Sequence, residues 1–436
     1  ERIYKQDDVE MDDVAKKDLH SGKWLFGRGA SDMKGGGAIT YSMFEEYSEN
    51  KEFDGNIIIL GVPDEENLSA GMRSAIYLLK ELKKKHDLEY VLMLNVEPHE
   101  KVKDNHITIY DGSVGKIMPI LLVRGKLAHV GQIYKGFNPI NLLSEIIRKT
   151  ELNPDFIERE GNTVTPAPTW LYSRDRKDVY DVSLPLTAGG YMSMLTLSKS
   201  PKDILEQLKQ ISMEAFEKVI SDMKISFERY RDLSDMNYGG INWKVNVKLY
   251  SELYTEIAKE KGESFKTEIY NCQKEIEKKI ESNEITRIEK TLEYYSNLSP
   301  LVVIALAPPY YPSTNNSMLH DTEEINKLID GIGKFANDEL GLGVYTQNYF
   351  TGISDLSYGL FTGNNENIDY ISDNMIFWGD MYSIPLKEIR ELSMPVLNIG
   401  PWGRDLHKYT ERVYKKDLFD TVPRLIDFVV RSIFDK

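Results

Sequence analysis

The sequence predicts an α/β fold: a mixed, largely parallel sheet covered by helices, with a smaller α+β domain inserted into it. Two continuous apolar runs, at residues 56–62 and 90–95, are typical of strands covered on both faces. A helical pattern separates them, which indicates a parallel strand–helix–strand unit. A second group of strands and helices occupies residues 115–249. Because 436 residues are long for one compact unit, we expect a main domain at 1–114 and 250–436, interrupted by this insertion.

The first part of the main domain is predicted to begin with a loop. Residues 1–22 are charged and show no periodicity. A short extended run at 23–26 then leads through a glycine-rich turn into a helix at 38–47. The helix between the two apolar runs carries apolar residues at helical spacing: Met72, Ala75, Ile76, Leu79 and Leu82.

The inserted domain is predicted from three strand patterns and two helices. The strands are expected at residues 116–124, 191–197 and 243–249. The helices open after Asn138 and Ser200, each a capping residue followed by proline at the first helical position. This alternation predicts a small α+β unit.

The second part of the main domain begins with solvated helices. Residues 251–296 are rich in Glu and Lys, with apolar residues at helical spacing. Residues 301–307 form a third apolar run and predict a buried strand, and 394–399 predict another. The chain closes with a helix whose apolar face comprises Val422, Leu425, Ile426 and Val429.

Charge and cysteine content exclude several classes of partner. The net charge is −15, from 54 basic and 69 acidic side chains. A surface of this sign repels phosphate backbones and anionic lipids, so we expect no nucleic-acid or membrane partner. No apolar run approaches the roughly 20 residues that span a bilayer. The single cysteine, Cys272, fits a reducing compartment, and we expect a cytoplasmic protein.

The glycine-rich turn at residues 27–37 holds a single acid, Asp32. Such turns often bind phosphate, but the phosphate loop needs Ser or Thr after its lysine, and Lys34 is followed by glycine. The dinucleotide fingerprint needs glycine where Asp32 lies, and a carboxylate would repel phosphate. A carboxylate among glycines suits a cation better. The motif alone also allows a tight structural turn.

Further acids follow the predicted strands. Glu65 and Glu66 follow the first apolar run, Glu97 follows the second, and His407 follows the last predicted strand. The carboxyl ends of parallel strands meet at one sheet edge, so we expect these groups and Asp32 together. Like charges 4 Å apart repel by about 4 kcal/mol at an effective dielectric near 20, and divalent cations relieve that repulsion. Carboxylate and imidazole ligands favour zinc, with manganese or cobalt as alternatives.

The adjacent acids Glu65 and Glu66 can take different roles. Neighbouring side chains in extended backbone point in opposite directions, so one can bind metal while the other acts as a general base. Each residue alone has a plainer interpretation: an acidic first helical turn at 64–66, a surface acid at Glu97, and a capping or core histidine at His407. The joint placement favours a metal site.

These residues resemble a known family, the co-catalytic zinc amidohydrolases and exopeptidases. It includes aminoacylase, carboxypeptidase G and succinyl-diaminopimelate desuccinylase. The motifs stand in the order of that family across residues 23–436, namely 27–35, 64–66, 97–98, 125–129, 136–138, 352–355 and His407. Within the family, residues 191–202 and 353–358 look most like its arginine-utilisation branch.

The resemblance implies a zinc-exopeptidase-like fold and a role for each acid. Asp32 would bridge two Zn²⁺ ions and carry a cis peptide bond to the next residue. Glu66 and His407 would complete one metal site, and Glu97 would serve the other. Glu65 would be the general base that activates water and passes its proton to the leaving amine.

The resemblance also implies a lid and a substrate pocket. His129 would reach from the inserted domain of a partner subunit to stabilise the oxyanion, which implies a homodimer through that domain. Gly352, Ile353 and Ser354 would line the substrate pocket.

One part of the family's pattern is missing. The family supplies a further metal ligand from an H-x-D motif before the glycine turn, and the residues before that turn contain none. His20, the nearest histidine, lies in sequence typical of a loop. The sequence begins at Glu1, and we expect the motif upstream of it. A chain without the motif would hold one ion, through Asp32, Glu66 and His407, because two carboxylates alone bind a second ion weakly.

The sequence therefore predicts a metal-dependent hydrolase with two zinc ions in the full-length protein. Its substrate would be a small-molecule amide: an N-acyl amino acid, a ureido compound or a dipeptide. The resemblance places the reaction in arginine or amino-acid catabolism. The alternative, to which the missing motif points, is a non-catalytic metal- or metabolite-binding relative with a degenerate site.

Overall fold

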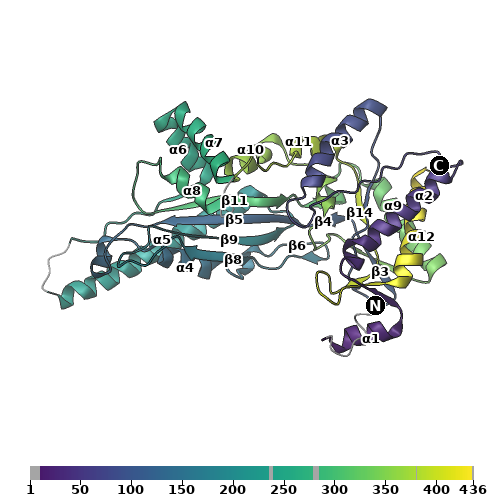
Figure 1. The fold of residues 1–436 in the computed structure, drawn as a ribbon, viewed down its shortest axis with the longest axis horizontal. Helices are drawn as coiled ribbons and strands as arrows, with labels where there is room; N and C mark the ends of the chain where they lie inside the picture. The colour runs from purple at the N-terminus through teal and green to yellow at the C-terminus, as the bar shows by residue number, and fades with distance from the viewer. Residues whose placement is uncertain (1–9, 235–238, 278–283, 380, 435–436) are drawn as a thin grey trace.

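The computed structural model describes residues 10–234, 239–277, 284–379 and 381–434. The chain forms two regions side by side, each built on its own β-sheet and covered by helices (Figure 1). One sheet has five strands and the other has four, and both combine parallel with antiparallel neighbours. The predicted mixed α/β architecture is confirmed.

The five-stranded sheet lies in the larger region. Its strands, in spatial order, are β10 (Val247–Leu249), β11 (Leu301–Tyr311), β5 (Gly115–Arg124), β9 (Thr187–Thr196) and β8 (Thr169–Asp175). Strands β10 and β11 are parallel, and the other neighbours are antiparallel. β5 and β9 correspond to the predicted strands at 116–124 and 191–197, whereas the strand predicted at 243–249 is shortened to β10.

Helices cover both faces of this sheet. Alternate residues of β5 point to opposite faces and are apolar on both, so each face is buried against helices. Leu121 and Val123 pack in the core with α4 (Pro139–Thr150) and α5 (Pro201–Leu233). Ile120 and Leu122 pack with the helices of the opposite face, α6 (Tyr250–Lys261), α7 (Glu263–Glu277) and α8 (Glu284–Leu292). Asn138 and Ser200 cap α4 and α5, as their sequence positions predict.

The four-stranded sheet organises the smaller region. Its strands, in spatial order, are β13 (Gly343–Gln347), β3 (His106–Tyr110), β14 (Val396–Asn398) and β2 (Met93–Asn95). β14 runs parallel to β2, and β13 parallel to β3, while β14 and β3 are antiparallel. One core cluster joins this sheet to α2 (Gly36–Glu49), α9 (Glu323–Leu340) and α12 (Val422–Phe434).

Further helices and short strands complete the two regions. Helices α3 (Ala70–His86), α10 (Asn365–Asn374) and α11 (Leu386–Leu392) pack into the larger core. A three-stranded sheet contains β1 (Trp24–Phe26), β16 (Arg412–Tyr414) and β15 (Gly403–Arg404). Two strand pairs are β4 (Gly112–Ser113) with β12 (Thr314–Asn315), and β6 (Arg159–Glu160) with β7 (Thr163–Val164).

Between β4 and β5, and again between β11 and β12, the chain passes from one region to the other. β11 pairs with β5 along its length, so the strand predicted at 301–307 belongs to the five-stranded sheet. That sheet therefore extends beyond residue 249. The division of the chain into 1–114, 115–249 and 250–436 stays a prediction.

Two predicted elements are wrong. Residues 56–62 form no strand; they are half-buried or exposed, and Ile58 is 42% exposed. An apolar run can fill a groove without pairing in a sheet, and β2, the expected neighbour, pairs with β14. The predicted loop at 1–22 contains α1 (Asp13–Ser21), capped by Asp12, while residues 1–9 lie outside the described residues.

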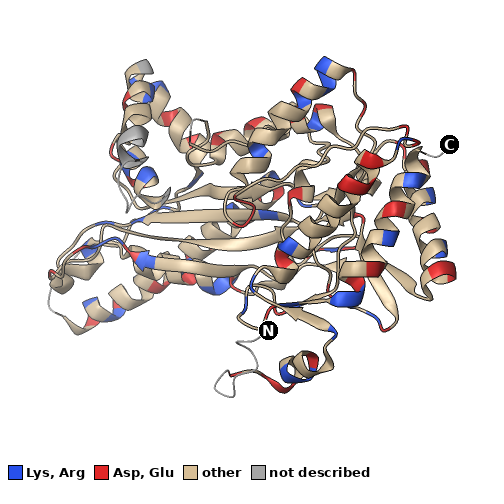
Figure 2. Cartoon of the chain, turned by 45° about the vertical axis from the view of Figure 1, so that its right-hand side comes forward, with Lys and Arg blue, Asp and Glu red and all other residues tan. Residues whose placement is uncertain are grey.

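Acidic and basic residues are interspersed along the surface helices, and the strands carry few charges (Figure 2). None of the helices in the described ranges is long and apolar enough to cross a membrane.

Candidate active site

A cavity of about 290 Å³ lies where the two regions meet, and we call it the acidic cavity. Its walls come from both regions: the glycine turn, the segments after β2 and β14, the start of β5 and the end of β11. The predicted general base and all four predicted metal ligands line it, namely Asp32, Glu65, Glu66, Glu97 and His407.

The glycine turn places Asp32 at the cavity wall. The turn follows β1, and α2 begins at Gly36. A Cβ atom on Gly36 would lie 2.2 Å from the carbonyl oxygen of Val96, so the start of α2 approaches the end of β2 more closely than any side chain would permit. The peptide bond between Asp32 and Met33 is cis, as the family resemblance implies.

Glu411 holds this turn in place. Its side chain is fully buried and accepts hydrogen bonds from the backbone N–H groups of Ser31 (3.0 Å) and Asp32 (3.1 Å). Arg28 Nη1 donates to it at 2.6 Å. Burial alone would raise the pKa of Glu411, but these bonds outweigh it and hold the pKa below its ordinary value. Glu411 lies 379 positions from Asp32, so no local motif connects the two residues.

His407 lies in a loop fixed by buried ion pairs. Asp405 (φ 55°) and His407 (φ 63°) adopt left-handed backbone, which costs a non-glycine residue about 1–2 kcal/mol. Arg412, with a side chain 2% exposed, donates to Asp405 at 2.5 Å and to Asp18 at 2.8 Å. Arg404 also bonds Asp18, at 2.9 Å. We call the six residues involved the arginine-paired cluster: Asp18, Asp405 and Glu411 with Arg28, Arg404 and Arg412.

Three side chains in the acidic cavity converge on one point. His407 Nε2 lies 2.8 Å from Asp32 Oδ2 and 3.0 Å from Glu66 Oε1. One ligand atom from each of the three lies within 4.8 Å of the others. Zinc binds nitrogen and oxygen ligands at about 2.0–2.2 Å, so a single ion can contact all three.

Glu97 is a buried acid without a basic partner. Asn398 fixes its backbone: the Glu97 N–H donates to Asn398 Oδ1 at 2.8 Å, and Asn398 Nδ2 donates to the Glu97 carbonyl at 3.0 Å. Burial, and then the charges of Asp32 and Glu65, raise the pKa of Glu97 well above its ordinary value. Within the described chain no Lys or Arg forms an ion pair with it. This carboxyl group suits a cation from outside the chain.

Glu65 has the properties expected of a general base. Burial raises its pKa to about 8, with further contributions from the charges of Asp355, Glu66 and Asp32. Its backbone carbonyl accepts hydrogen bonds from Tyr311 Oη at 3.1 Å and Ser69 Oγ at 3.3 Å. These two hydroxyls also bond each other at 2.9 Å. The backbone of Glu65 is therefore fastened to β11.

Two further residues of the site were missed in the sequence. Burial raises the pKa of Asp355 to about 6, and its Oδ1 atom is buried without a hydrogen-bond partner in the described chain. Asp355 closes the 352–355 motif, which could have drawn attention to it. Tyr311 lines the cavity from the end of β11, and only the sheet register brings it there.

The predicted substrate-binding residues occupy two environments. Gly352 and Ile353 line the acidic cavity. Ser354 is fully buried, and its Oγ accepts hydrogen bonds from Leu356 N at 3.0 Å and Asn95 Nδ2 at 3.1 Å. Ser354 thus fastens this segment to the end of β2 instead of lining the cavity.

His129, His20 and His99 lie outside the converging group. His129 is exposed on the larger region, where its Nδ1 accepts from Gly131 N at 3.1 Å, so it does not line the cavity of its own chain. His20 lies in α1, with its ring 2.7 Å from the Lys16 carbonyl. His99 is buried, and its Nδ1 lies 2.8 Å from the Gly400 carbonyl.

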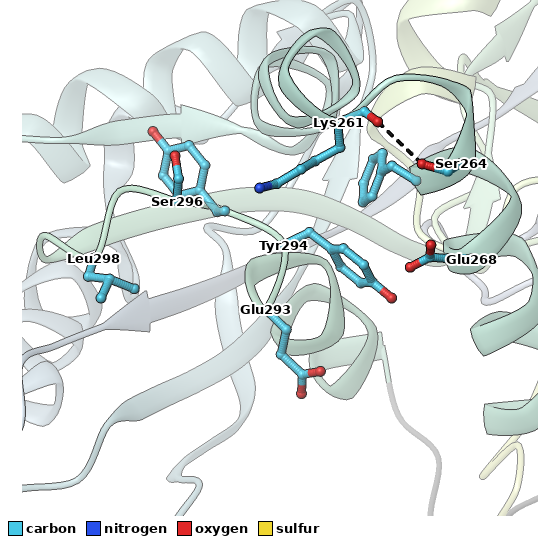
Figure 3. Close-up of a pocket in the computed structure, with 9 residues that line it drawn as sticks. Lys261, Ser264, Glu268, Glu293, Tyr294, Ser296 and Leu298 are labelled. Atoms are coloured by element: carbon cyan, nitrogen blue, oxygen red, sulfur yellow. Dashed lines mark hydrogen bonds between the residues drawn. The ribbon is translucent and has the colours of Figure 1, made fainter.

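A larger cavity, of about 510 Å³, is lined by the end of α6, the first part of α7 and the segment that follows α8. Figure 3 shows its lining residues, with Ser264 bonded to the carbonyl of Lys261. None of the predicted site residues lines it. The candidate active site is therefore the smaller, acidic cavity.

The family model for peptidase family M20/M25/M40 matches residues 8–426. The chain belongs to this family. It is 33% identical to the uncharacterized protein YqjN of Bacillus subtilis (strain 168), over 96% of this chain and 76% of that protein. It is 30% identical to Protein RocB of the same organism, over 96% of this chain and 74% of that one. The crystal structure of aminopeptidase PepT from Bacillus cereus ATCC 10987 has 13% identity and a TM-score of 0.48, covering 92% of this chain and 71% of that chain.

Membership of family M20/M25/M40 confirms the resemblance found in the motifs. It also confirms the expected class of activity: the chain is a hydrolase of the metallopeptidase and amidohydrolase kind. The roles of the individual site residues stay predictions.

Proposed function

We propose that this chain of family M20/M25/M40 hydrolyses the amide bond of a small N-acyl amino acid, ureido compound or dipeptide. The observation that carries the proposal is the convergence of Asp32, Glu66 and His407 beside Glu65 in one cavity. Metal ligands and a general base side by side are what metal-assisted hydrolysis requires.

The donor set fits divalent metal ions. Asp32, Glu66 and His407 would hold one ion, and the buried Glu97, with Asp32 between the two sites, would contribute to a second. Mixed carboxylate and imidazole ligands favour Zn²⁺, with Mn²⁺ or Co²⁺ as alternatives. Ions bound there supply Lewis acidity and a water of lowered pKa.

Glu65 performs the proton transfers in this proposal. It accepts a proton from the attacking water and donates it to the leaving amine as the amide bond breaks. Its pKa of about 8 reflects burial first and then the negative charges of Asp355, Glu66 and Asp32. Cations in the cavity would lower that pKa, so that Glu65 is ionised and acts as a base near neutral pH.

We also propose a homodimer in which His129 of one chain completes the cavity of the other. Exposed apolar side chains surround His129: Leu127 and Val130 beside it, and Tyr180 and Val182 on the adjoining segment. The two segments are joined by the hydrogen bond from Val130 N to the Val182 carbonyl, at 2.9 Å. Exposed apolar patches of this kind support association between chains.

The dimer is tested by sedimentation of the variant Leu127→Asp/Tyr180→Asp. The two introduced carboxylates should repel each other across the interface and yield monomers. The rate of hydrolysis should then fall about as much as in the His129→Ala variant, which should remain a dimer. A monomeric wild-type protein with full activity would refute this part of the proposal.

The resemblance of residues 191–202 and 353–358 to the arginine-utilisation branch supports arginine or amino-acid catabolism as the setting. The single cysteine agrees with a reducing compartment such as the cytoplasm. Arginine-derived N-acyl compounds therefore belong in the first substrate panel.

The test uses the full-length chain, stripped of metal and then reloaded with zinc, manganese or cobalt. N-acyl amino acids, N-carbamoyl amino acids and dipeptides are screened by release of free amine. The proposal predicts turnover that disappears on stripping and returns on reloading. Metal binding without turnover of any compound would instead favour a non-catalytic metal- or metabolite-binding relative.

A further inference from the structure

The β6–β7 hairpin belongs to the larger region, between α4 and β8, and the chemistry proposed above does not use it. A loop of two residues, Gly161 and Asn162, joins its strands. The buried carboxylate of Glu158 fixes the base of the hairpin, because it accepts hydrogen bonds from Ser198 N and Lys199 N, both at 2.8 Å. In Figure 1, β6 lies at the end of the larger region that faces the smaller one.

The loop of the hairpin is bonded to the smaller region at the end of β13. Asn162 N donates to Asn348 Oδ1 at 3.1 Å, and Asn348 N donates to Asn162 Oδ1 at 3.0 Å. Asn162 Nδ2 also donates to the carbonyl of Thr346, at 2.8 Å. The two asparagines are thus bonded side chain to backbone in both directions, which fixes one orientation of the hairpin against the segment after β13.

Tyr349 extends the same contact. Its hydroxyl donates to Glu160 Oε2 at 2.9 Å, and its N–H donates to Thr163 Oγ1 at 3.3 Å. The side chain is fully buried and packs with Val114 and Leu197, which lie just before β5 and just after β9. The backbone, hydroxyl and ring of one residue are therefore all held by the hairpin and its surroundings.

The approach of the hairpin to β13 leaves no room for a side chain in the loop. Gly161 adopts left-handed backbone, with φ 56°, and a Cβ atom there would lie 2.0 Å from Asn348 Oδ1. A residue other than glycine at this position would push the hairpin and the segment apart.

The segment held in this way leads directly into the acidic cavity. Phe350 follows Tyr349 and lines the cavity, as do Gly352 and Ile353. None of the described residues 159–164 lines it. The metal ligands and the general base come from other segments of the chain, so the hairpin acts on one wall of the cavity without touching the reacting groups.

We infer that the β6–β7 hairpin positions the substrate-binding wall at residues 350–353, with Asn162 as the positioning residue. The wall takes its shape from both regions, because a loop of the larger region holds a segment of the smaller one in place. This inference rests on the proposed function and deepens it: the hairpin sets the affinity for the amide substrate, and Glu65 with the metal ligands sets the rate of the chemical step.

The first test needs no turnover. Hydrogen exchange is measured in peptides covering residues 346–354 of the full-length, zinc-loaded protein. Asn162→Ala removes two of the three hydrogen bonds that the asparagine makes, so exchange in these peptides should rise at least ~5-fold. Gly161→Ala should have the same effect by pushing the hairpin away.

The matched control is Asn337→Ala, at an exposed position of α9 where the side chain donates to the neighbouring Asp338. It should leave exchange at residues 346–354 unchanged. Exchange that stays at the wild-type rate in both Asn162→Ala and Gly161→Ala would overturn the inference.

The second test separates positioning from stability. With the best substrate of the panel, Asn162→Ala should raise KM at least ~5-fold and leave kcat and metal content near the wild-type values, because no reacting group is altered. A purely structural hairpin would instead lower the active fraction, and with it the apparent kcat, at an unchanged KM.

An unchanged KM in Asn162→Ala, with or without a fall in kcat, would overturn the inference. Failure of the proposed function would appear as absent turnover in the wild type, and the exchange measurement would still decide whether the hairpin holds the wall. The two failures are therefore distinct.

Discussion

Two groups of acids lie near the glycine turn, and the pKa values within them move in opposite directions. In the arginine-paired cluster, burial would raise the pKa values of Asp405 and Glu411, yet both lie below their ordinary values because hydrogen bonds to the ionised forms outweigh it. In the acidic cavity, the pKa values of Glu65 and Glu97 are raised. Burial acts on both groups, so the partners make the difference.

The comparison separates structural acids from functional ones. Arginine side chains from β15, β16 and the glycine turn meet the acids of the first group at 2.5–2.9 Å. The second group shares its cavity with one histidine and one lysine, and none of its acids forms an ion pair with an arginine in the described chain. A fold that pairs one set of acids with arginines and leaves a neighbouring set without them provides the second set with a place for cations.

The largest expected effect comes from unpairing the first group. Arg412→Met would leave Asp18 and Asp405 buried without their main cation, and removing one partner of a buried pair costs about 3–5 kcal/mol. Urea unfolding measures this loss. Arg404→Met, at a side chain 34% exposed, is the matched control and should cost clearly less. Equal small losses would show that the cluster does not need its buried arginine.

The next effect concerns catalysis in the acidic cavity. Glu65→Gln should reduce kcat at least ~10²-fold while leaving metal content unchanged, because a general base is lost and no ligand is. Glu66→Gln is the matched variant: one position away, it should lose metal as well as rate. Metal analysis and steady-state kinetics of the two proteins distinguish these roles. Near-normal turnover in Glu65→Gln would remove this residue from the mechanism.

The pH dependence of stability should reveal the unpaired acids. A carboxyl whose pKa is raised on folding stabilises the protein most at a pH below its ordinary pKa, and this stabilisation is lost as the pH rises through the raised value. For Glu65 the ordinary pKa is 4.5 and the raised pKa is about 8. Asp405 and Glu411, whose pKa values are lowered, contribute stability that is lost below that range. Each pKa unit corresponds to about 1.4 kcal/mol.

The metal-free protein should therefore unfold at lower temperature as pH rises from about 5 to about 8, and added zinc should remove the trend. Differential scanning calorimetry over this range checks the sign. A melting temperature that rises over the same range without metal would contradict the assignment of unpaired acids.

The smallest effect tests Glu97 alone. Glu97→Gln removes a buried charge without a basic partner, so the metal-free variant should melt slightly above the metal-free wild type. The same substitution should weaken binding of a second ion. A lower melting temperature for the metal-free variant would mean that a partner stabilises this charge.

Much of the fold could be predicted from local patterns. Capping residues such as Asn138 and Ser200 mark helix starts because their side chains satisfy backbone N–H groups at once. The strand at 301–307 was predicted, but its pairing with β5 was not. An apolar pattern predicts that a strand is buried, but it does not predict which strand it pairs with. For the same reason residues 56–62 were expected in a sheet and are not. The helix α1 was missed although Asp12 caps it and Ala15 and Leu19 share its buried face.

The sequence predicts the acids of the acidic cavity but not the residues that surround and support them. Asp32 stands in a glycine turn, and Glu97 and His407 follow β2 and β14, which run parallel. Glu66 lies in the same cavity although the residues before it, 56–62, form no strand. Glu411 and Arg412 act on residues more than 370 positions away, and no local signal connects them. Lys116 and Tyr311 enter the cavity through strand register, which depends on the assembled sheet.

The most direct measurement is a zinc titration of the metal-free full-length chain by calorimetry, with wild type and Asp32→Ala compared at neutral pH. We predict that the wild type binds at least one ion per chain tightly, with release of protons from the cavity, and that Asp32→Ala loses this binding. A wild-type protein that binds no zinc, or an Asp32→Ala protein that binds it equally well, would contradict the claim that cations hold the acids of this cavity together.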